Sequence, residues 1–224
     1  MRKKLLAEEV INRLKSEYPD SVCTLDAGSA WQLLVSVRLA AQCTDKRVNE
    51  TVPALFAKYD SPEKLAKAKI PDIEKFIKPC GLFKTKARDI KACMTELVER
   101  FDGIVPDTME ELLSLPGVGR KSANLILGDV FGQESYVCDT HCIRLSGRIG
   151  LSDGSRDPYK VEMQLRKIVP PEESGALCHR LVDHGRAVCK AQNPQCESCC
   201  LSDVCRNMQK QLRDKQSAYK EKNI

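Results

Sequence analysis

Lys121 is the residue of this chain whose type and position best suit nucleophilic chemistry. It follows the turn sequence LPGVGR and falls in the first turn of a helix predicted to begin near Arg120. The positive end of a helix dipole disfavours a charged ammonium, so we expect the pKa of Lys121 to be lowered toward the range in which a free amine exists at neutral pH. A lysine nucleophile requires that free amine. A contact to a phosphate explains the position equally well, so both interpretations stay open from these residues alone.

The turn before this lysine, LPGVG at residues 115–119, predicts a site for a phosphate group. One helix ends near Leu115, the chain turns at Pro116 and Gly117, and Gly119 permits a positive φ or a close approach of the backbone. N–H groups gathered at the start of the next helix can bind a phosphate oxygen without any side-chain charge. A tight turn between two helices with no ligand is the alternative. The candidate phosphate-binding residues are Gly117, Val118, Gly119 and Arg120.

Asp139, eighteen residues after Lys121, is the candidate catalytic carboxylate. It is a natural N-cap for a helix that begins at Thr140. A cap carboxylate held by backbone N–H groups is fixed in place and ionised, which suits it to stabilise a developing positive charge. Capping alone is the simpler interpretation of this segment, and the two roles are compatible.

Four cysteines near the C-terminus have the spacing of a metal site. Cys189, Cys196, Cys199 and Cys205 form the pattern C-x6-C-x2-C-x5-C. Zinc sites usually present two close pairs, whereas one compact segment that supplies all four thiolates favours a 4Fe-4S cluster. Zinc and structural disulfides are the less favoured alternatives. Cys200 is adjacent to Cys199 and is expected to point away from the cluster.

A structural role for such a cluster fits the rest of the chain. No second cluster motif, flavin fingerprint or glycine-rich nicotinamide turn accompanies the cysteines, so an electron-transfer chain has little support. The cluster would join a loop that has too few apolar residues to fold alone. It would also position Arg186, Lys190 and Arg206 toward a phosphate backbone.

Composition excludes several classes of protein. The 224 residues are 42% hydrophobic and 30% charged, which is typical of a globular chain. No stretch approaches the roughly 20 apolar residues of a membrane span, and Glu8 and Glu9 interrupt the apolar residues near the N-terminus. We therefore expect neither membrane insertion nor secretion, and a cytoplasmic location.

The charge of the chain is concentrated at its C-terminal end. The formal net charge is +5, and residues 206–224 carry six basic and two acidic side chains. A polyanion site in the body of the protein must therefore be a local basic patch.

Helix signals fill most of the chain. Ser61 precedes Pro62 and Glu63 as an N-cap, and Thr108 has capping-box spacing to Glu111. Only short runs such as residues 135–138 have strand character. The predicted fold class is all-α. Breaks at residues 150–158 and 169–171 are too short to be flexible linkers, so two domains would be packed against each other.

With these residues described, the chain resembles the endonuclease III family of DNA glycosylases in the helix-hairpin-helix superfamily. The resemblance runs from about Ala7 to Cys205 and includes LLVSVRLAAQCTD at 33–45, GLFKTKA at 81–87, LPGVGRKSAN at 115–124, CDTH at 138–141, HGRAVC at 184–189 and the cysteine loop. Departures from the family pattern are few: the basic tail runs on past the cluster, and Cys138 is a small change expected to be neutral unless it packs against the carboxylate.

The resemblance implies an activity on double-stranded DNA that contains damaged bases or abasic sites. Lys121 matches the nucleophile and Asp139 the catalytic carboxylate of a glycosylase that removes oxidised pyrimidines and cuts the strand 3′ to the abasic site by β-elimination. Gln42 and Leu82 match residues that fill the space left by the flipped nucleotide; a turn amide and a core leucine are the simpler alternatives. His141 matches a position beside the aspartate, with a helix first-turn histidine as its alternative.

The resemblance also implies an architecture. A helical bundle of residues 22–134 would hold the hairpin, and residues 1–21 together with 135–211 would form the iron–sulfur domain. Lys121 and Asp139 would face each other across the cleft between them. The basic tail at 212–224 would be partly disordered and add only nonspecific affinity for DNA. A monomer associated with the bacterial nucleoid is expected.

Three other functions compete with this interpretation. A monofunctional adenine glycosylase would lack the hairpin lysine and carry a glutamate in the segment that matches LLVSVRLAAQ, which has no acid here. A noncatalytic iron–sulfur DNA-binding protein would need neither Lys121 nor Asp139. A redox sensor would keep the cysteines but need no nucleophile.

Overall fold

The computed structural model describes the backbone of residues 2–222 and the side chains of residues 2–214. Helices and turns make up the described residues, which contain no β-strand. The chain forms two compact units. Unit 1 combines residues 1–22 with residues 134–224, and unit 2 is the continuous segment of residues 23–133. None of the described helices is long and apolar enough to cross a membrane.

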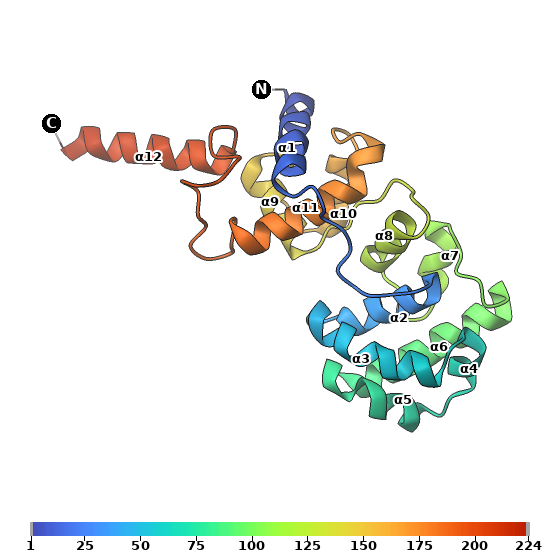
Figure 1. The fold of residues 1–224 in the computed structure, drawn as a ribbon. Coiled ribbons are helices and arrows are strands. Elements are labelled where there is room, and N and C mark those ends of the chain that lie inside the picture. The colour runs from blue at the N-terminus through green and yellow to red at the C-terminus, as the bar shows by residue number, and fades with distance from the viewer. Residues whose placement is uncertain (1, 223–224) are drawn as a thin grey trace. The chain divides into compact units, whose positions relative to one another are not determined.

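Unit 2 is built around the long helix α6, Phe83–Phe101. This helix packs against α4 and α5, and its buried residues Ile90, Met94 and Leu97 follow the spacing of one helix face. Helix α2 packs against α3, α6 and α8, and α7 packs against α8 (Figure 1). The remaining elements are α2 (Ala30–Ala40), α3 (Asp45–Lys58), α4 (Pro62–Lys67), α5 (Ile70–Ile77), η1 (Lys78–Cys80), α7 (Met109–Ser114) and α8 (Arg120–Asp129).

Unit 1 joins the first helix of the chain to the C-terminal helices. Helix α1 (Lys3–Glu17) packs against α11 (Ser174–Ala187), which also packs against α9 (Thr140–Ile149). Val10, Ile11 and Leu14 of α1 are buried, and burial of each such side chain contributes roughly 1.5–3 kcal/mol. The other elements of this unit are α10 (Pro158–Leu165), η2 (Pro171–Glu173) and α12 (Arg206–Lys222).

Local capping chemistry sets several helix starts. Ser61 accepts a hydrogen bond from the N–H of Lys64 at the start of α4, and Thr108 accepts one from the N–H of Glu111 at the start of α7. Thr44 caps α3 by accepting a hydrogen bond from the N–H of Arg47, so Asp45 is the first residue of the helix.

The C-terminal tail is helical in the part that the structure describes, and its partial disorder stays a prediction. Helix α12 continues through the basic tail to Lys222, and its first residues pack against α9. The tail is rich in Gln, Lys and Arg, which have high helix propensity, and no Gly or Pro interrupts residues 206–222. Residues 223–224 and the side chains from residue 215 onward lie outside the described residues.

Candidate active site

The predicted hairpin is formed by α7, the turn at residues 115–119 and α8 in unit 2. The N–H of Val118 donates to the carbonyl of Leu115 at 3.2 Å, which closes the turn. Gly117 has a φ of +76°, whereas Gly119, the N-cap of α8, has a φ of −102°. The residue that needs glycine for a left-handed conformation is therefore Gly117. Nothing lies within 4 Å of a Cβ built on Gly119, so the backbone there is open to a ligand.

The start of α8 presents the features of an anion site. No side chain caps α8, because its N-cap is Gly119. Lys121 is the second residue of this helix, and its side chain is exposed. The first N–H groups of a helix have no intrahelical partner and carry partial positive charge. This loop can bind a phosphate oxygen and leaves the lysine amine accessible.

An ion pair beneath the turn supports the hairpin. Nε of Arg38, on α2, donates to Oδ2 of Asp89, on α6, at 2.9 Å. A Cβ built on Gly117 would lie 3.0 Å from Cβ of Asp89 and 3.2 Å from Nε of Arg38. The turn therefore packs directly on this ion pair, a support that no local sequence pattern predicts, because Arg38 and Asp89 lie far from Gly117 along the chain.

Gln42 and Leu82 share an unusual backbone conformation. Their φ angles are +55° and +46°, in the left-handed region that residues other than glycine seldom adopt. Both side chains are exposed, and 60% of Leu82 is accessible to solvent, so it is not a core leucine. Strained residues that point an apolar or amide side chain into solvent are typical of binding sites.

Asp139 caps α9 in unit 1. Its Oδ1 accepts a hydrogen bond from the N–H of Cys142 at 2.8 Å, and the residue is half-buried. The buried thiols of Cys138 and Cys142 lie 4.0 Å apart. The carboxylate is thus held by the helix start, as the sequence predicts, and Cys138 is directed into the protein interior.

His141, two residues further along α9, is held against α11. Its Nδ1 lies 3.1 Å from a guanidinium nitrogen of Arg144. A Cβ on Gly185 would lie 2.5 Å from that Nδ1 and 3.0 Å from the Arg144 nitrogen, so only glycine fits at this point of α11. The glycine of the HGRAVC segment therefore has a packing role.

The four cysteines predicted to bind a metal line one pocket. The pocket is bounded by Cys189, Cys196, Cys199 and Cys205, with apolar walls from Ile149, Val188, Leu201 and Met208; Cys200 does not line it. Within the described residues, no three or more His, Cys, Asp or Glu side chains form a group that could hold a single metal ion. Burial raises the pKa of Cys199 to about 11 and also raises the pKa of Cys196.

Several groups hold the cysteine loop in place. The N–H of Leu201 donates to Sγ of Cys199 at 3.4 Å, and Nε2 of His184 lies 3.3 Å from the same sulfur. His184 is buried, its pKa is lowered by burial, and its Nδ1 lies 3.1 Å from the hydroxyl of Tyr18. Arg13, on α1, donates to the carbonyl of Cys200 at 2.8 Å. Helix α1 therefore contacts and supports the C-terminal part of the cysteine loop.

The predicted site residues thus fall into two groups. The hairpin, Lys121, Gln42 and Leu82 belong to unit 2, whereas Asp139, His141, Lys190 and the cysteines belong to unit 1. The approach of Lys121 to Asp139 stays a prediction.

Comparison with known proteins decides the family. Residues 35–171 match the family described as HhH-GPD superfamily base excision DNA repair protein. Endonuclease III of Synechocystis sp. is 44% identical over 208 residues, which cover 92% of this chain and 94% of that protein. Endonuclease III of Bacillus subtilis is 37% identical and covers 95% of this chain and 96% of its own length. The chain belongs to the endonuclease III family.

Solved structures agree with this family. The structure of a trapped endonuclease III–DNA covalent intermediate matches with a TM-score of 0.88 and 37% identity, covering 95% of this chain and all of that chain. The all-α helix-hairpin-helix fold and the family predicted from the sequence motifs are confirmed. Within the endonuclease III fold, the roles of individual residues stay predictions.

Proposed function

We propose that this chain is a bifunctional DNA glycosylase and abasic-site lyase that removes oxidised pyrimidines in base excision repair. Its substrate would be double-stranded DNA in the bacterial nucleoid, and it would act as a monomer. The supporting observation is an exposed lysine, Lys121, in the first turn of the helix that follows the hairpin, in a chain of the endonuclease III family.

The first step forms a bond between the enzyme and the sugar. The damaged nucleotide is flipped out of the duplex, and Nζ of Lys121, as the free amine, attacks C1′ of its deoxyribose. The bond from C1′ to the base breaks, and the base leaves with that electron pair and takes up a proton. Loss of a proton from Nζ and opening of the sugar ring then leave a Schiff base between Nζ and C1′.

The second step cuts the strand. Removal of a proton from C2′ expels the 3′ phosphate oxygen by β-elimination, and water later releases the lysine. Asp139 would stabilise the positive charge that develops on the sugar. Its cap hydrogen bond uses Oδ1, and Oδ2 is the oxygen that we assign to that charge. A carboxylate with one oxygen fixed by a backbone N–H needs little reorganisation during the reaction.

DNA binding in this proposal uses backbone groups as well as side chains. The N–H groups at the start of α8 would bind a phosphate, which the open backbone at Gly119 supports. Gln42 and Leu82 would enter the space left by the flipped nucleotide, which their exposure and positive φ angles support. His141 and Lys190 are further candidate DNA contacts from unit 1.

The cysteine pocket fits a 4Fe-4S cluster. Its four thiols come from one segment and face a common space with apolar walls, and each thiolate would bind one iron. When bound, the cluster supplies folding energy for the loop at residues 189–205. The chain's own groups then complete the sulfur environment: His184 and the N–H of Leu201 lie beside Cys199, and Arg148 donates to Sγ of Cys189 at 3.5 Å.

Borohydride trapping tests the proposed function. The protein is incubated with a duplex that contains one thymine glycol, and borohydride reduces any Schiff base to a stable adduct. We expect an adduct with the natural chain and none with Lys121→Ala. Lys46→Ala is the matched control, because Lys46 is also an exposed second residue of a helix. Binding without an adduct in the natural chain contradicts the lyase, and release of free base then identifies a monofunctional glycosylase.

A further inference from the structure

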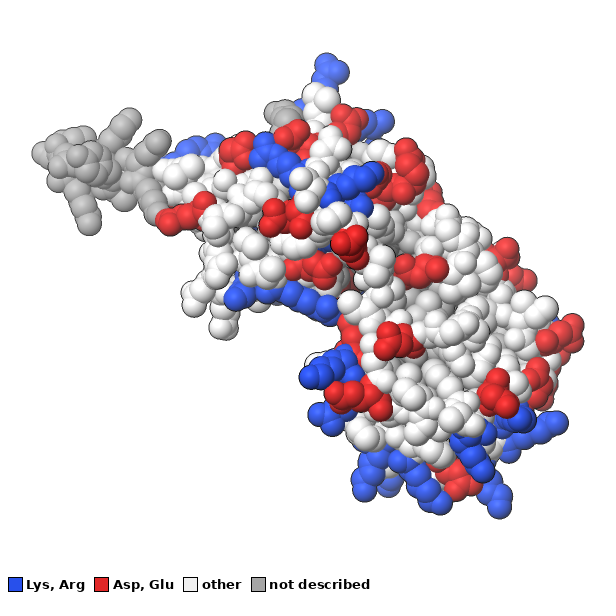
Figure 2. Space-filling view, in the orientation of Figure 1, with Lys and Arg blue, Asp and Glu red and all other residues white. Residues whose placement is uncertain are grey.

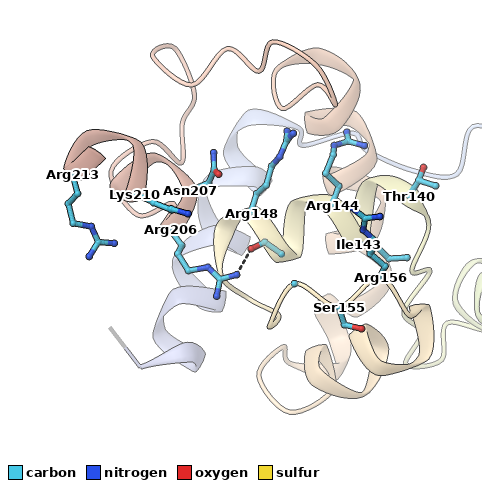
Figure 3. A pocket seen from close by; sticks show the side chains of 12 residues that line it. Thr140, Ile143, Arg144, Arg148, Ser155, Arg156, Arg206, Asn207, Lys210 and Arg213 are labelled. Atoms are coloured by element: carbon cyan, nitrogen blue, oxygen red, sulfur yellow. Dashed lines mark hydrogen bonds between the residues drawn. The ribbon is translucent and has the colours of Figure 1, made fainter. Parts of the chain in front are cut away.

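A broad cationic groove lies in unit 1, beside the helix that Asp139 caps. Its volume is about 790 Å³, and its walls come from α9, the loop at residues 154–156 and the start of α12. Figure 3 shows Arg206, Lys210 and Arg213 extending from α12 and Arg144 and Arg148 from α9. With Arg156, six basic side chains line the groove, and no acidic side chain does.

Most contacts of these cations are with neutral groups, although Arg148 also donates to Sγ of Cys189 at 3.5 Å. Arg206 donates to the carbonyls of Gly147 at 2.7 Å and Ser152 at 3.4 Å, and Arg148 donates to the carbonyls of Lys190 and Ala191. Carbonyls orient a guanidinium but do not neutralise it. Among the ion pairs of the described residues, none involves a lining cation of this groove.

Some basic residues elsewhere in the chain form ion pairs with acidic neighbours. Figure 2 shows Lys and Arg side chains over the end of unit 2 that carries α4 and α5. There Lys64 pairs with Asp60 at 2.8 Å and Lys75 pairs with Asp72 at 2.9 Å. That surface is a solvated mixture of both charges, so the groove in unit 1 is the stronger candidate for binding a polyanion.

The arrangement of the charges fits a linear polyanion. Arg144 and Arg148 are four residues apart on α9, and Arg206, Lys210 and Arg213 lie at successive i+4 and i+3 positions on α12. Such positions share one helix face, with about 6 Å of rise for each four residues. Small-molecule sites are mostly apolar, but Ile143 is the one large apolar side chain in this lining. Two rows of cations suit backbone phosphates better than a nucleoside.

We propose that this groove binds the phosphate backbone of duplex DNA outside the damaged nucleotide. The proposal rests on the proposed function. Thr140, which directly follows Asp139, lines the groove, so a strand whose damaged sugar lies at Asp139 continues into it. Lys210 and Arg213 belong to the part of α12 beyond Cys205, where the family resemblance ends. Lys210 and Arg213 thus take part in a defined site instead of adding only nonspecific affinity.

The salt dependence of DNA binding tests this groove. The dissociation constant of an undamaged duplex is measured against salt for the natural chain and for the double variant Lys210→Gln with Arg213→Gln. Each lost phosphate contact lowers the slope of log K against log salt by about 0.9, so we expect a loss of about 1.8. The control, Lys3→Gln with Lys4→Gln, makes the same change of net charge on exposed residues of α1 and should keep its slope.

Each outcome of this salt experiment either supports or overturns the proposal for the groove. A slope unchanged in the groove variant, or lowered equally in the control, overturns the proposal. Binding of polyglutamate that is lost in the groove variant while the DNA slope is kept also overturns it, and indicates an acidic protein partner instead. Borohydride trapping is run on the same samples. If the natural chain forms the adduct while the groove variant keeps its salt slope, the proposal for the groove is wrong and the proposed function stands.

Unit 2 contains a completely buried lysine. Lys86, on α6, has no exposed surface. Its Nζ donates to the carbonyls of Leu39 and Cys80, both at 2.8 Å, and burial lowers its pKa. Leu39 lies three residues before Gln42, and Cys80 lies two residues before Leu82. One ammonium therefore joins the two chain segments that carry the proposed gap-filling residues.

Packing alone does not require this charge. A buried ammonium loses hydration, and a methionine of similar length can fill the same space without that cost. The two hydrogen bonds instead fix the relative position of two strained segments, with positive φ at both Gln42 and Leu82. We infer that Lys86 is a positioning residue for the gap-filling pair, an inference that also rests on the proposed function.

A fluorescent base tests Lys86. A base analogue that brightens on unstacking is placed opposite the lesion, and Lys86→Met is compared with Lys91→Met. Lys91 is the matched control, because it lies on the same helix and donates to the carbonyls of Ala66 and Ala68 at 2.8 and 2.7 Å, far along the chain from Gln42 and Leu82. We expect Lys86→Met to lose most of the fluorescence rise and about tenfold in kcat/KM, while Lys91→Met keeps both.

Coupling to Leu82 separates positioning from packing. If Lys86 acts through Leu82, combining Lys86→Met with Leu82→Ala lowers kcat/KM little further than the stronger single change. Additive effects, or a full fluorescence rise in Lys86→Met, overturn the inference. If Lys86→Met does not fold, Lys86→Arg replaces it; this change keeps the charge but moves the donors, and it must show the same fluorescence loss. If the natural chain itself forms no adduct with borohydride, the proposed function is wrong, which is a different result from a failure of the inference about Lys86.

Discussion

Arg38 and Asp89 form an ion pair directly beneath Gly117, which ties the hairpin turn to two helices distant in sequence. The guanidinium belongs to α2 and the carboxylate to α6. The turn can approach this pair only because residue 117 lacks a Cβ. The shape of the proposed phosphate site is therefore set by tertiary packing as well as by the turn sequence.

Replacing Gly117 by alanine should therefore disrupt the hairpin. The new Cβ would meet Cβ of Asp89 at 3.0 Å, and the φ of +76° is unfavourable for alanine. Strain of this kind costs on the order of 1–3 kcal/mol. Urea unfolding measures the loss. Gly119→Ala is the control, since its φ is −102° and nothing lies within 4 Å of the added Cβ. Equal losses of stability in the two variants would contradict this account.

Gly119→Ala should instead affect DNA binding. An added methyl group projects into the open space where we place a phosphate, so the affinity for duplex DNA should fall while the free energy of unfolding changes little. The measurement is a dissociation constant for an undamaged duplex, taken beside urea unfolding of the same sample. Unchanged affinity would place the phosphate elsewhere.

Substitutions at Asp139 can separate its role as a helix cap from its proposed catalytic role. Asparagine caps helices about as well as aspartate, so Asp139→Asn should change the free energy of unfolding by only a few tenths of a kcal/mol. Base release should nevertheless slow by roughly 10²–10⁴-fold, because the neutral amide neither stabilises positive charge nor moves a proton. Asp139→Ala should lose about 1 kcal/mol of stability in addition. Normal base release in Asp139→Asn would show that Asp139 serves only as a helix cap.

Features that depend on neighbouring residues could be predicted from the sequence. The caps at Ser61, Thr108 and Asp139 are present, because an N-cap needs one side-chain oxygen and an N–H two or three residues later. The cysteine spacing likewise identified four residues that line one pocket. The helical fold followed from the same local signals.

Features that depend on tertiary packing could not be predicted. Lysine is the residue type least expected inside a protein, and no pattern around Lys86 reports the two carbonyls that hold it. The apolar side chain of Leu82 predicts a buried residue, yet Leu82 is exposed and has a positive φ. The groove between α9 and α12 joins segments about sixty residues apart, and each segment alone appears only as a basic helix.

Adjacent thiols provide a test of the cluster. Cys199→Ser should lower the iron and acid-labile sulfide per chain and reduce stability, because serine is a poor ligand for these clusters and the loop depends on the bound group. Cys200→Ser should keep both, since Cys200 does not line the pocket. Iron and sulfide analysis of the purified variants decides between them. Loss of iron in both variants to the same extent would assign Cys200 to the cluster.

The stability of unit 1 should depend on pH through Glu173. Its carboxylate accepts a hydrogen bond from Lys15 at 2.9 Å and one from the buried Arg180 at 3.1 Å. These contacts, that of Lys15 first, lower the pKa of Glu173 below its ordinary value of 4.5. A carboxyl group whose pKa is lowered by folding binds fewer protons in the folded state, so it stabilises the protein above pH 4.5 and loses that contribution as the pH falls further.

Comparison of Glu173→Gln with the natural chain should reveal this contribution. At pH 7 we expect the variant to be about 1–3 kcal/mol less stable, because the buried guanidinium of Arg180 loses its carboxylate. The difference should shrink as the pH is lowered from about 5, where the natural carboxylate begins to take up a proton. Glu172→Gln is the control, since the neighbouring Glu172 is exposed and forms no ion pair within the described residues. Urea unfolding between pH 3 and 7 measures both differences, and a Glu173→Gln difference that stays constant over this range would mean that the charge of Glu173 contributes nothing to stability.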